Sequence, residues 1–308
     1  MVKYIIRRLL MLIGVLLGVS LFVFVIFNIS QGDPATIILG MGATPENVAQ
    51  LREELGLNEP LFVRYFDYLK KAIHLDFGNS WRTNMPVFYE VFSRFPVTVN
   101  LTFFSMLLAI VIGMPVGIIS AVKQYSIFDN SVMFVTLILT SLPPFWIGLM
   151  LMLLFSLKLD LFPATGADSW INYILPCITL ATRYIALIAR MTRSTMLEVV
   201  RSDYVRTAKA KGASWYRIIT KHCFKNVLIP IVTVIGVSFG YALGGAVLIE
   251  SVFTMPGVGI LLVESIRAKD LPIIMADVLL LGISFSIINL IVDILYGFID
   301  PRLRYQYK

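Results

Sequence analysis

The sequence is poor in charged residues, histidines and cysteines. Only 15% of its 308 residues are charged, and it has two histidines and two cysteines. His74 and His222 lie far apart in the chain and neither belongs to a Cys/His cluster, so a metal site built from these ligands is not expected. Cys177 falls in an apolar run and Cys223 in a basic segment, so we expect no disulfide between them.

Motifs of nucleotide binding and zinc-dependent proteolysis are also missing. The sequence contains no G-x-x-x-x-G-K-S/T string, which would cradle nucleotide phosphates, and no H-E-x-x-H string, which would hold a catalytic zinc. The paired aspartates or serine–histidine pair that an intramembrane protease needs within its spans are not seen either. We therefore expect a chain that is not an enzyme and that binds no cofactor or metal itself.

Apolar residues dominate what is present. They make up 58% of the chain, and the mean hydropathy is +0.83. A soluble domain cannot bury so much apolar surface, so most of it must face lipid or other helices. The net charge of +7 comes from basic residues gathered in a few loops. That clustering is typical of membrane orientation and unlike a nucleic-acid-binding stripe, so membrane lipid is the expected partner.

Six apolar runs are long enough to cross the hydrocarbon core, at about 9–28, 98–121, 131–157, 172–190, 227–250 and 276–299. The predicted fold class is an all-α polytopic membrane protein with six transmembrane helices. We divide it into a first span (1–29), a small helical extracytoplasmic segment (30–97), a five-span core (98–300) and a tail (301–308). The first run also resembles a secretory signal, but no A-x-A cleavage site follows it, so we expect a retained span.

Lysine and arginine residues are unevenly divided between the two sides of the membrane. With the amino terminus in the cytosol, cytosolic segments hold sixteen of them and the longer external segments hold nine. Loops rich in these residues stay inside the cell. We therefore expect both termini to be cytosolic.

Two regions outside the simple apolar runs are predicted to have defined structure. In the external segment, Thr44 is suited to cap a helix that ends at Gly56, and a second helix is expected over Leu61–Ile73. In the third span, Pro143 and Pro144 must break or kink the helix. Broken backbone at membrane depth is tolerated only against protein or a water-filled cavity. The break is therefore either a packing kink, which we favour, or a bend that lines a pathway.

The most informative segment lies between the fourth and fifth spans, at residues 191–226. We call it the cytosolic elbow. A helix is predicted from Thr192 to Lys211, with Ala208, Ala210 and Gly212 leaving a nearly bare surface where another backbone could approach closely.

The second half of the cytosolic elbow begins after a glycine. Gly212 suits a left-handed helix stop, and Ser214 suits the cap of a further turn that starts at an exposed Trp215. The whole segment is longer than a simple connector needs. This favours a docking surface over an ordinary positively charged loop.

The string Asp203-Tyr-Val-Arg-Thr-Ala-Lys-Ala-Lys-Gly212 resembles the EAA loop of ABC-importer permeases, in the form found in the dipeptide/oligopeptide/nickel permease family. Nearly the whole chain shares the resemblance, through Gly32-Asp-Pro34, Leu55-Gly-Leu-Asn-Glu-Pro60, Asp76-Phe-Gly-Asn-Ser80, Glu250 through Gly259, and Asp293 through Asp300-Pro-Arg302. Two departures occur. Arg206-Thr207 replaces the leading Glu-Ala of the general pattern, and Lys225 makes its I-x-L-P ending less distinct. Both departures fit the peptide branch better than the sugar or amino-acid branches.

The resemblance implies the permease subunit of an ATP-driven importer of short peptides, in a bacterial cytoplasmic (inner) membrane and with the type I ABC importer permease fold. Its implied partners are a second, homologous permease in a heterodimer, two cytosolic ABC ATPases that use ATP and Mg, and an extracytoplasmic substrate-binding protein. The residues implied to contact an ATPase are Asp203, Tyr204, Arg206, Thr207, Ala208, Ala210, Gly212, Ser214 and Trp215.

Four ionisable residues fall in or near spans: Arg183, Glu250, Asp277 and Asp293. Charges within a membrane are unfavourable and often functional. Arg183 is suited to pair with a peptide carboxylate or with Asp293, or to snorkel to the cytosolic interface. Glu250 and Asp277 are expected at the outer interface in structural roles. The candidates for the substrate pathway are Arg183, Pro143, Pro144 and Asp293.

Several alternatives stay open. Nickel or glutathione import by the same mechanism would give a similar sequence. A secondary transporter driven by an ion gradient would usually show internal repeats with corresponding midplane sites, and no such symmetry is found in the sequence. An exporter or channel would differ in the direction of transport and would need no binding protein.

Overall fold

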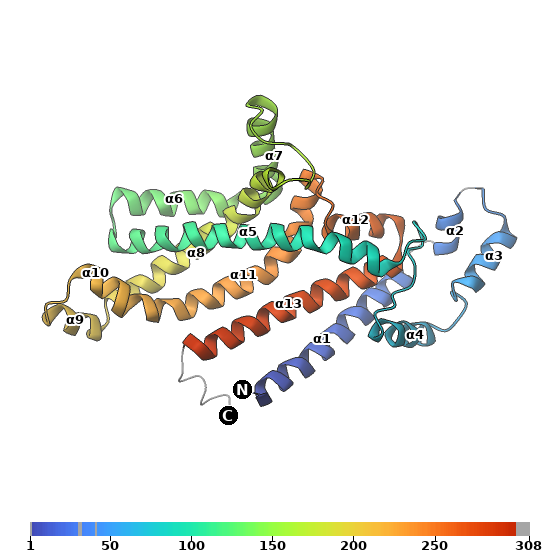
Figure 1. Ribbon diagram of the computed structural model, residues 1–308, viewed down its shortest axis with the longest axis horizontal. Helices are drawn as coiled ribbons and strands as arrows, with labels where there is room; N and C mark the ends of the chain where they lie inside the picture. Colours follow the sequence, from blue (N-terminus) through green and yellow to red (C-terminus); the bar gives the residue numbers. More distant parts are fainter. Residues whose placement is uncertain (1, 30–32, 41, 300–308) are drawn as a thin grey trace. The chain divides into compact units, whose positions relative to one another are not determined.

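The structure is a computed structural model that describes residues 2–29, 33–40 and 42–299 (Figure 1). Within these residues it is helical, with one isolated antiparallel bridge between Asn79 and Pro86. The predicted tail (301–308) and the Asp300-Pro-Arg302 string lie outside the described residues. The described chain divides into two compact units. Residues 2–8, 99–255 and 284–299 form the first, and residues 9–29, 33–40, 42–98 and 256–283 form the second.

Five helical segments are long and apolar enough to cross a membrane: Leu10–Ile29, Val87–Val122, Trp170–Val200, Asn226–Phe253 and Leu271–Ile294. A sixth candidate is the pair Ile127–Ser141 and Pro144–Lys158, which meets the same criterion but is bent by 101°. If this pair is counted as one broken span, the described residues contain six candidate spans, the number that the sequence predicts. The helices extend beyond the predicted apolar runs because backbone hydrogen bonding continues through polar residues.

The first unit is organised around α8 (Ile174–Val200). It packs against α6 (Ile127–Ser141), α7 (Pro144–Leu151) and α11 (Phe224–Phe253), with α6 and α11 visible on either side of it in Figure 1. A π-helical segment, η1 (Met152–Lys158), continues α7, and a 3-10 turn, η2 (Trp170–Tyr173), leads into α8. Many of the residues that α8 buries are alanine or threonine, so neighbouring backbones can come close.

Two glycines of α5 (Val87–Val122) lie directly against α8. A Cβ atom added at Gly117 would come 2.5 Å from the carbonyl oxygen of Ala189 and 2.7 Å from Cβ of Thr192. One added at Gly113 would come 2.9 Å from the carbonyl oxygen of Ile185. The two glycines form a G-x-x-x-G motif, which allows close packing of helices in membranes. The α5–α8 contact therefore depends on the absence of side chains at both positions.

The second unit contains four shorter helices and the parts of the long helices α1 (Val2–Ile29), α5 and α13 (Leu271–Ile299) that belong to it. The shorter helices are α2 (Pro34–Leu39), α3 (Pro45–Glu54), α4 (Leu61–Ile73) and α12 (Val258–Ala268).

The predictions for the external segment are confirmed, and two helices in this unit were not anticipated. The Thr44 hydroxyl oxygen accepts the N–H of Asn47 at 3.3 Å, and Gly56 has φ +64° just after α3. Helix α4 has the predicted bounds and packs on α1, where the Tyr65 hydroxyl donates to the carbonyl of Leu17 at 3.1 Å. The short helices α2 and α12 are not evident from the sequence, because neither has a long apolar run.

The break in the third span falls at the predicted prolines. Leu142 ends α6 with extended backbone (ψ 136°), Pro143 is also extended (ψ 133°), and Pro144 is the first residue of α7. Proline lacks an N–H group and suits the first turn of a helix. The pair therefore ends one helix and begins another. A Cβ atom added at Gly148, four residues after Pro144, would come 3.2 Å from the side chains of Phe253 and Thr179, so the segment after the break lies against α8 and α11.

Candidate functional site

The first half of the cytosolic elbow differs from the predicted single helix over Thr192–Lys211. Residues 192–200 belong to α8, and a break at Arg201–Ser202 separates them from α9 (Asp203–Ala210). Ser202 is extended (φ −70°, ψ 153°), and its hydroxyl donates to the carbonyl of Val199 at 2.6 Å. That local hydrogen bond competes with the helical pattern, which periodicity alone does not reveal.

The second half of the cytosolic elbow follows the prediction. Gly212 has φ +80°, the left-handed conformation expected at a helix stop. The Ser214 hydroxyl oxygen accepts the N–H of Arg217 at 3.4 Å and begins α10 (Trp215–Arg217). A π-helical segment, η3 (Ile218–Cys223), then joins α10 to α11.

A buried apolar cluster holds the cytosolic elbow on the ends of α5, α8 and α11. Val205 of α9 and Ile218 of η3 are 3% and 0% exposed, and they pack with Met196 of α8 and Ala121 of α5. Side chains buried on several elements fix the position of the elbow relative to α8. Such an arrangement lets the elbow and α8 move together.

The outer surface of the cytosolic elbow exposes both aromatic and small residues. Tyr204, Trp215 and Tyr216 are 43%, 42% and 79% exposed, and Ala210 and Gly212 are exposed as well. A Cβ atom added at Gly212 would meet nothing within 4 Å. The predicted exposure of Trp215 is confirmed, and Gly212 adjoins open space.

The remaining predicted docking residues divide into two groups. Asp203, Arg206 and Thr207 are exposed; Arg206 pairs with Asp203 at 3.7 Å, and the Thr207 hydroxyl donates to the carbonyl of Asp203 at 3.0 Å. Ala208, in contrast, is half-buried and packs against the apolar cluster beneath the elbow. Its expected place on the bare outer surface is wrong, because it follows Val205 by three residues and shares its inward face.

Two substitutions at Gly212 test whether the helix stop needs a left-handed backbone conformation. Gly212→Asn should keep a folded elbow, because asparagine tolerates a positive φ. Gly212→Val should destabilise it by about 1 kcal/mol or more, because a β-branched residue is strained there. Protease sensitivity of the elbow in membranes measures the difference. Equal sensitivity of the two variants would show that the left-handed conformation is not needed.

Cys223 gives a second local prediction. It is fully buried under the elbow, and burial raises the pKa of its thiol. The raised pKa leaves less thiolate at neutral pH. Because the thiolate is the nucleophile, the rate at which Cys223 reacts with a maleimide should rise only as the pH climbs toward that raised pKa. We expect Cys223 in native membranes to react at least about tenfold more slowly than a cysteine introduced by Trp215→Cys. Equal rates would contradict the burial of Cys223.

The pathway candidates do not gather at one place. Asp293 pairs with Arg8 at 3.0 Å, so, of the three alternatives for Arg183, the pairing with Asp293 is not found. Arg183 is exposed and lines a groove of about 570 Å³ between α8 and α11, together with Tyr184, Ser238 and Tyr241. Of the four pathway candidates, Arg183 alone is among the described residues that line this groove.

The two other ionisable residues, Glu250 and Asp277, are both 0% exposed, which fits structural roles. Among the described residues no group of three His, Cys, Asp or Glu side chains could hold a metal ion. A G-x-S-x-G string occurs at Gly236–Gly240, but it lies in the middle of α11 with Ser238 3% exposed. A hydrolase needs that motif at a strand-to-helix turn.

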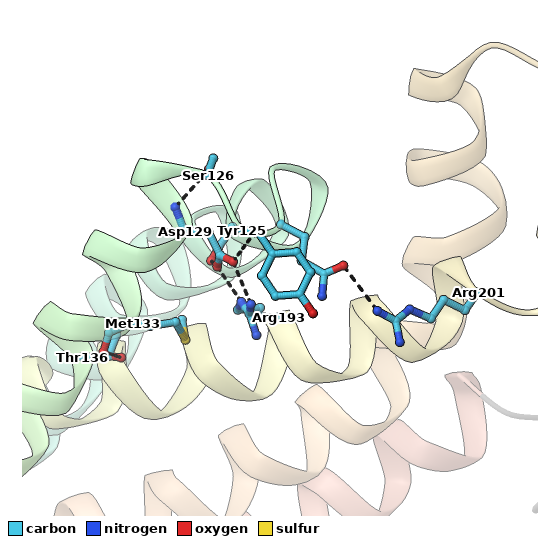
Figure 2. A network of polar contacts seen from close by, with 9 residues as sticks. Tyr125, Ser126, Asp129, Met133, Thr136, Arg193 and Arg201 are labelled. Carbon is cyan, nitrogen blue, oxygen red and sulfur yellow. Dashed lines mark hydrogen bonds and ion pairs between the residues drawn. The ribbon is translucent and has the colours of Figure 1, made fainter.

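An ion pair that the sequence analysis missed joins α6 to α8 near the elbow (Figure 2). Arg193 donates from Nε to Oδ1 of Asp129 at 2.6 Å and from Nη2 to Oδ2 at 2.7 Å. The Ser120 hydroxyl and the N–H of Tyr125, the latter at 2.9 Å, donate to the same carboxylate. The only signal in the sequence was one acidic and one basic residue at the ends of two apolar runs.

The fold belongs to a known class, the type I ABC importer permease fold. The fold is similar to that of the MetNI methionine ABC transporter in inward-facing conformations, with a TM-score of 0.56 over 69% of this chain and 97% of that chain. Sequence identity is 20%, so this likeness shows the fold alone.

Family membership comes from sequence comparison. Residues 113–305 match the family described as binding-protein-dependent transport system inner membrane component, and residues 1–102 match its N-terminal counterpart. The chain is 43% identical to the dipeptide transport system permease protein DppB of Alkalihalophilus pseudofirmus, across 99% of this chain and 100% of that protein. It is 42% identical, with the same coverage, to the glutathione transport system permease protein GsiC of Escherichia coli and of Salmonella typhimurium.

The chain therefore belongs to the family of binding-protein-dependent ABC importer permeases. It is a multi-span membrane subunit of an importer, and ATP hydrolysis is carried out by partner ATPases rather than by this chain.

Proposed function

We propose that this permease imports short peptides, that its cytosolic elbow docks on an ATPase, and that a second, homologous permease completes the pathway. The observation that carries the docking role is the build of the elbow: its underside is buried in an apolar cluster, and its outer side exposes Ala210 and Gly212 together with Tyr204, Trp215 and Tyr216. Small residues let a partner surface approach closely, and aromatic side chains are frequent anchors at interfaces.

The groove beside Arg183 supports peptide transport. Arg183 has no hydrogen bond or ion pair to the other described residues, and the Tyr241 side chain beside it is 68% exposed. A charged residue in a span normally faces a water-filled cavity or the interior of a bundle. A second permease subunit covering this face would enclose the groove, and Arg183 would then attract the carboxylate of a passing peptide.

The orientation proposed here places both termini and the elbow in the cytosol. The excess of lysine and arginine in the corresponding segments supports it. It also puts the external helices α3 and α4 on the side from which a substrate-binding protein would deliver a peptide. ATP and Mg would act only on the partner ATPases.

Uptake by the reconstituted transporter tests this function. Proteoliposomes would contain this chain, its partner permease and two ATPases, with ATP inside and the binding protein and radiolabelled dialanine outside. We expect uptake that requires ATP, the ATPases and the binding protein. Uptake by this chain alone under an ion gradient would refute the proposal in favour of a secondary transporter.

Glutathione is the second candidate substrate, because the relatives named for dipeptide and for glutathione transport are about equally similar to this chain. Competition separates the candidates. An excess of unlabelled glutathione or of nickel should leave dialanine uptake unchanged if short peptides are the substrate. Strong inhibition by either one would identify it as the preferred solute.

A further inference from the structure

The Asp129–Arg193 ion pair lies between the cytosolic elbow and the break in the third span. Arg193 precedes the last residue of α8 by seven positions, or about 10 Å along the helix. Asp129 is in the first turn of α6, and the opposite end of α6 adjoins the proline break at Leu142–Pro144. The pair thus fastens the helix that leads to the break onto the helix that leads to the elbow.

The geometry of the pair is that of a rigid connection. Two parallel hydrogen bonds fix the planes of both side chains, which a single bond would not do. The Asp129 side chain is 1% exposed, and it also accepts hydrogen bonds from Ser120 and from the N–H of Tyr125. Since Tyr125 belongs to the turn between α5 and α6, the carboxylate ties three elements together (Figure 2).

The surroundings add a second point of attachment. Gly117 of α5 packs against Thr192, the residue next to Arg193, and Met196 of α8 enters the apolar cluster that holds the elbow. Helices α5, α6 and α8 are therefore connected on the elbow side of the first unit. Stability alone is a weak reason for the ion pair, because apolar residues of similar size are often at least as stabilising as a buried ion pair.

We propose that Asp129 and Arg193 are positioning residues that transmit movement of the cytosolic elbow to α6 and, through α6, to the break in the third span. The inference rests on the proposed docking of the elbow on an ATPase. When the ATPase tilts the elbow and α8, the two-point bond turns α6 with them, and the segment after the proline break moves relative to its neighbours. Without the bond, α8 slides past α6 and ATP is hydrolysed with little transport.

Three variants of the complete transporter test this role, with uptake of dialanine and hydrolysis of ATP measured in the same proteoliposomes. Arg193→Lys keeps the charge but cannot make the two-point bond. The double variant Asp129→Leu with Arg193→Met removes both charges and leaves no unpaired ion. The control is Arg82→Lys, which alters the exposed pair of Arg82 with Glu264 in the second unit.

We expect Arg193→Lys and the double variant to assemble and to import about tenfold less dialanine per ATP hydrolysed, an effect within the usual range of coupling between two sites. Arg82→Lys should keep the wild-type ratio. A purely structural role for the pair predicts that every variant that assembles keeps that ratio, and such a result would overturn the proposal. If Arg193→Lys fails to assemble, the double variant decides alone.

The wild-type transporter separates this inference from the proposed function. If wild type shows no ATP-dependent uptake, the proposed function fails. If wild type is coupled and both assembled variants are equally well coupled, only the role of Asp129 and Arg193 fails.

Discussion

Ala210→Trp is expected to leave the transporter in the membrane but to lower uptake per ATP hydrolysed about tenfold or more. Ala210 is exposed on the cytosolic elbow two residues before Gly212, where an added Cβ atom would meet nothing within 4 Å. An indole ring at this position would hold a docked ATPase away from the elbow surface. The measurement is the ratio of dialanine uptake to ATP hydrolysis in proteoliposomes.

A small substitution at the same position provides the control. Ala210→Ser adds one hydroxyl and should keep the wild-type ratio. Crosslinking gives an independent check: a cysteine introduced by Ala210→Cys or Trp215→Cys should capture an ATPase in native membranes. Normal coupling in Ala210→Trp, or the failure of both cysteines to capture an ATPase, would show that the elbow docks elsewhere or not at all.

Gly117→Ala is expected to destabilise the first unit by about 1–3 kcal/mol, although it adds a single methyl group. The new Cβ would lie 2.5 Å from the carbonyl oxygen of Ala189 and 2.7 Å from Cβ of Thr192. Both contacts are shorter than real atoms allow, and both partners belong to a packed helix that cannot give way locally. The effect is measured as the decrease in the thermal unfolding midpoint of the purified chain in detergent, relative to wild type.

Gly244→Ala is the matched control. Gly244 also lies in a long apolar helix, but a Cβ atom there would meet nothing within 4 Å. Because alanine favours helix more than glycine does, this variant should unfold at the same temperature or slightly higher. Similar losses in the two variants would mean that Gly117 does not mediate a close α5–α8 contact.

Local features of the chain were predictable because their causes lie within a few residues. The cap at Thr44 and the helix stop at Gly212 depend on a capping hydroxyl and on the backbone freedom of glycine, which the sequence states directly. The spans were predictable for a similar reason, since length and hydropathy decide what can cross a membrane.

Errors arose where two segments far apart in the sequence meet. Ala208 was expected on the outer surface, but the apolar cluster draws in the face of α9 that carries Val205. Asp293 was considered as a partner of Arg183, but it meets Arg8 from the other end of the chain. Neither the hydrophobic periodicity nor a motif within one segment specifies which distant residue it will contact.

The sequence by itself determined that this chain is a multi-span membrane protein with a basic segment rich in small residues between two spans, because apolar length, basic clustering and small residues at fixed spacing are properties of single segments. Only the tertiary structure decided which helices are joined. The close approach of Gly117 to Ala189 and the ion pair of Asp129 with Arg193 arise from residues more than 60 positions apart. Their energy depends on distances of a few ångströms that exist only once the helices have packed.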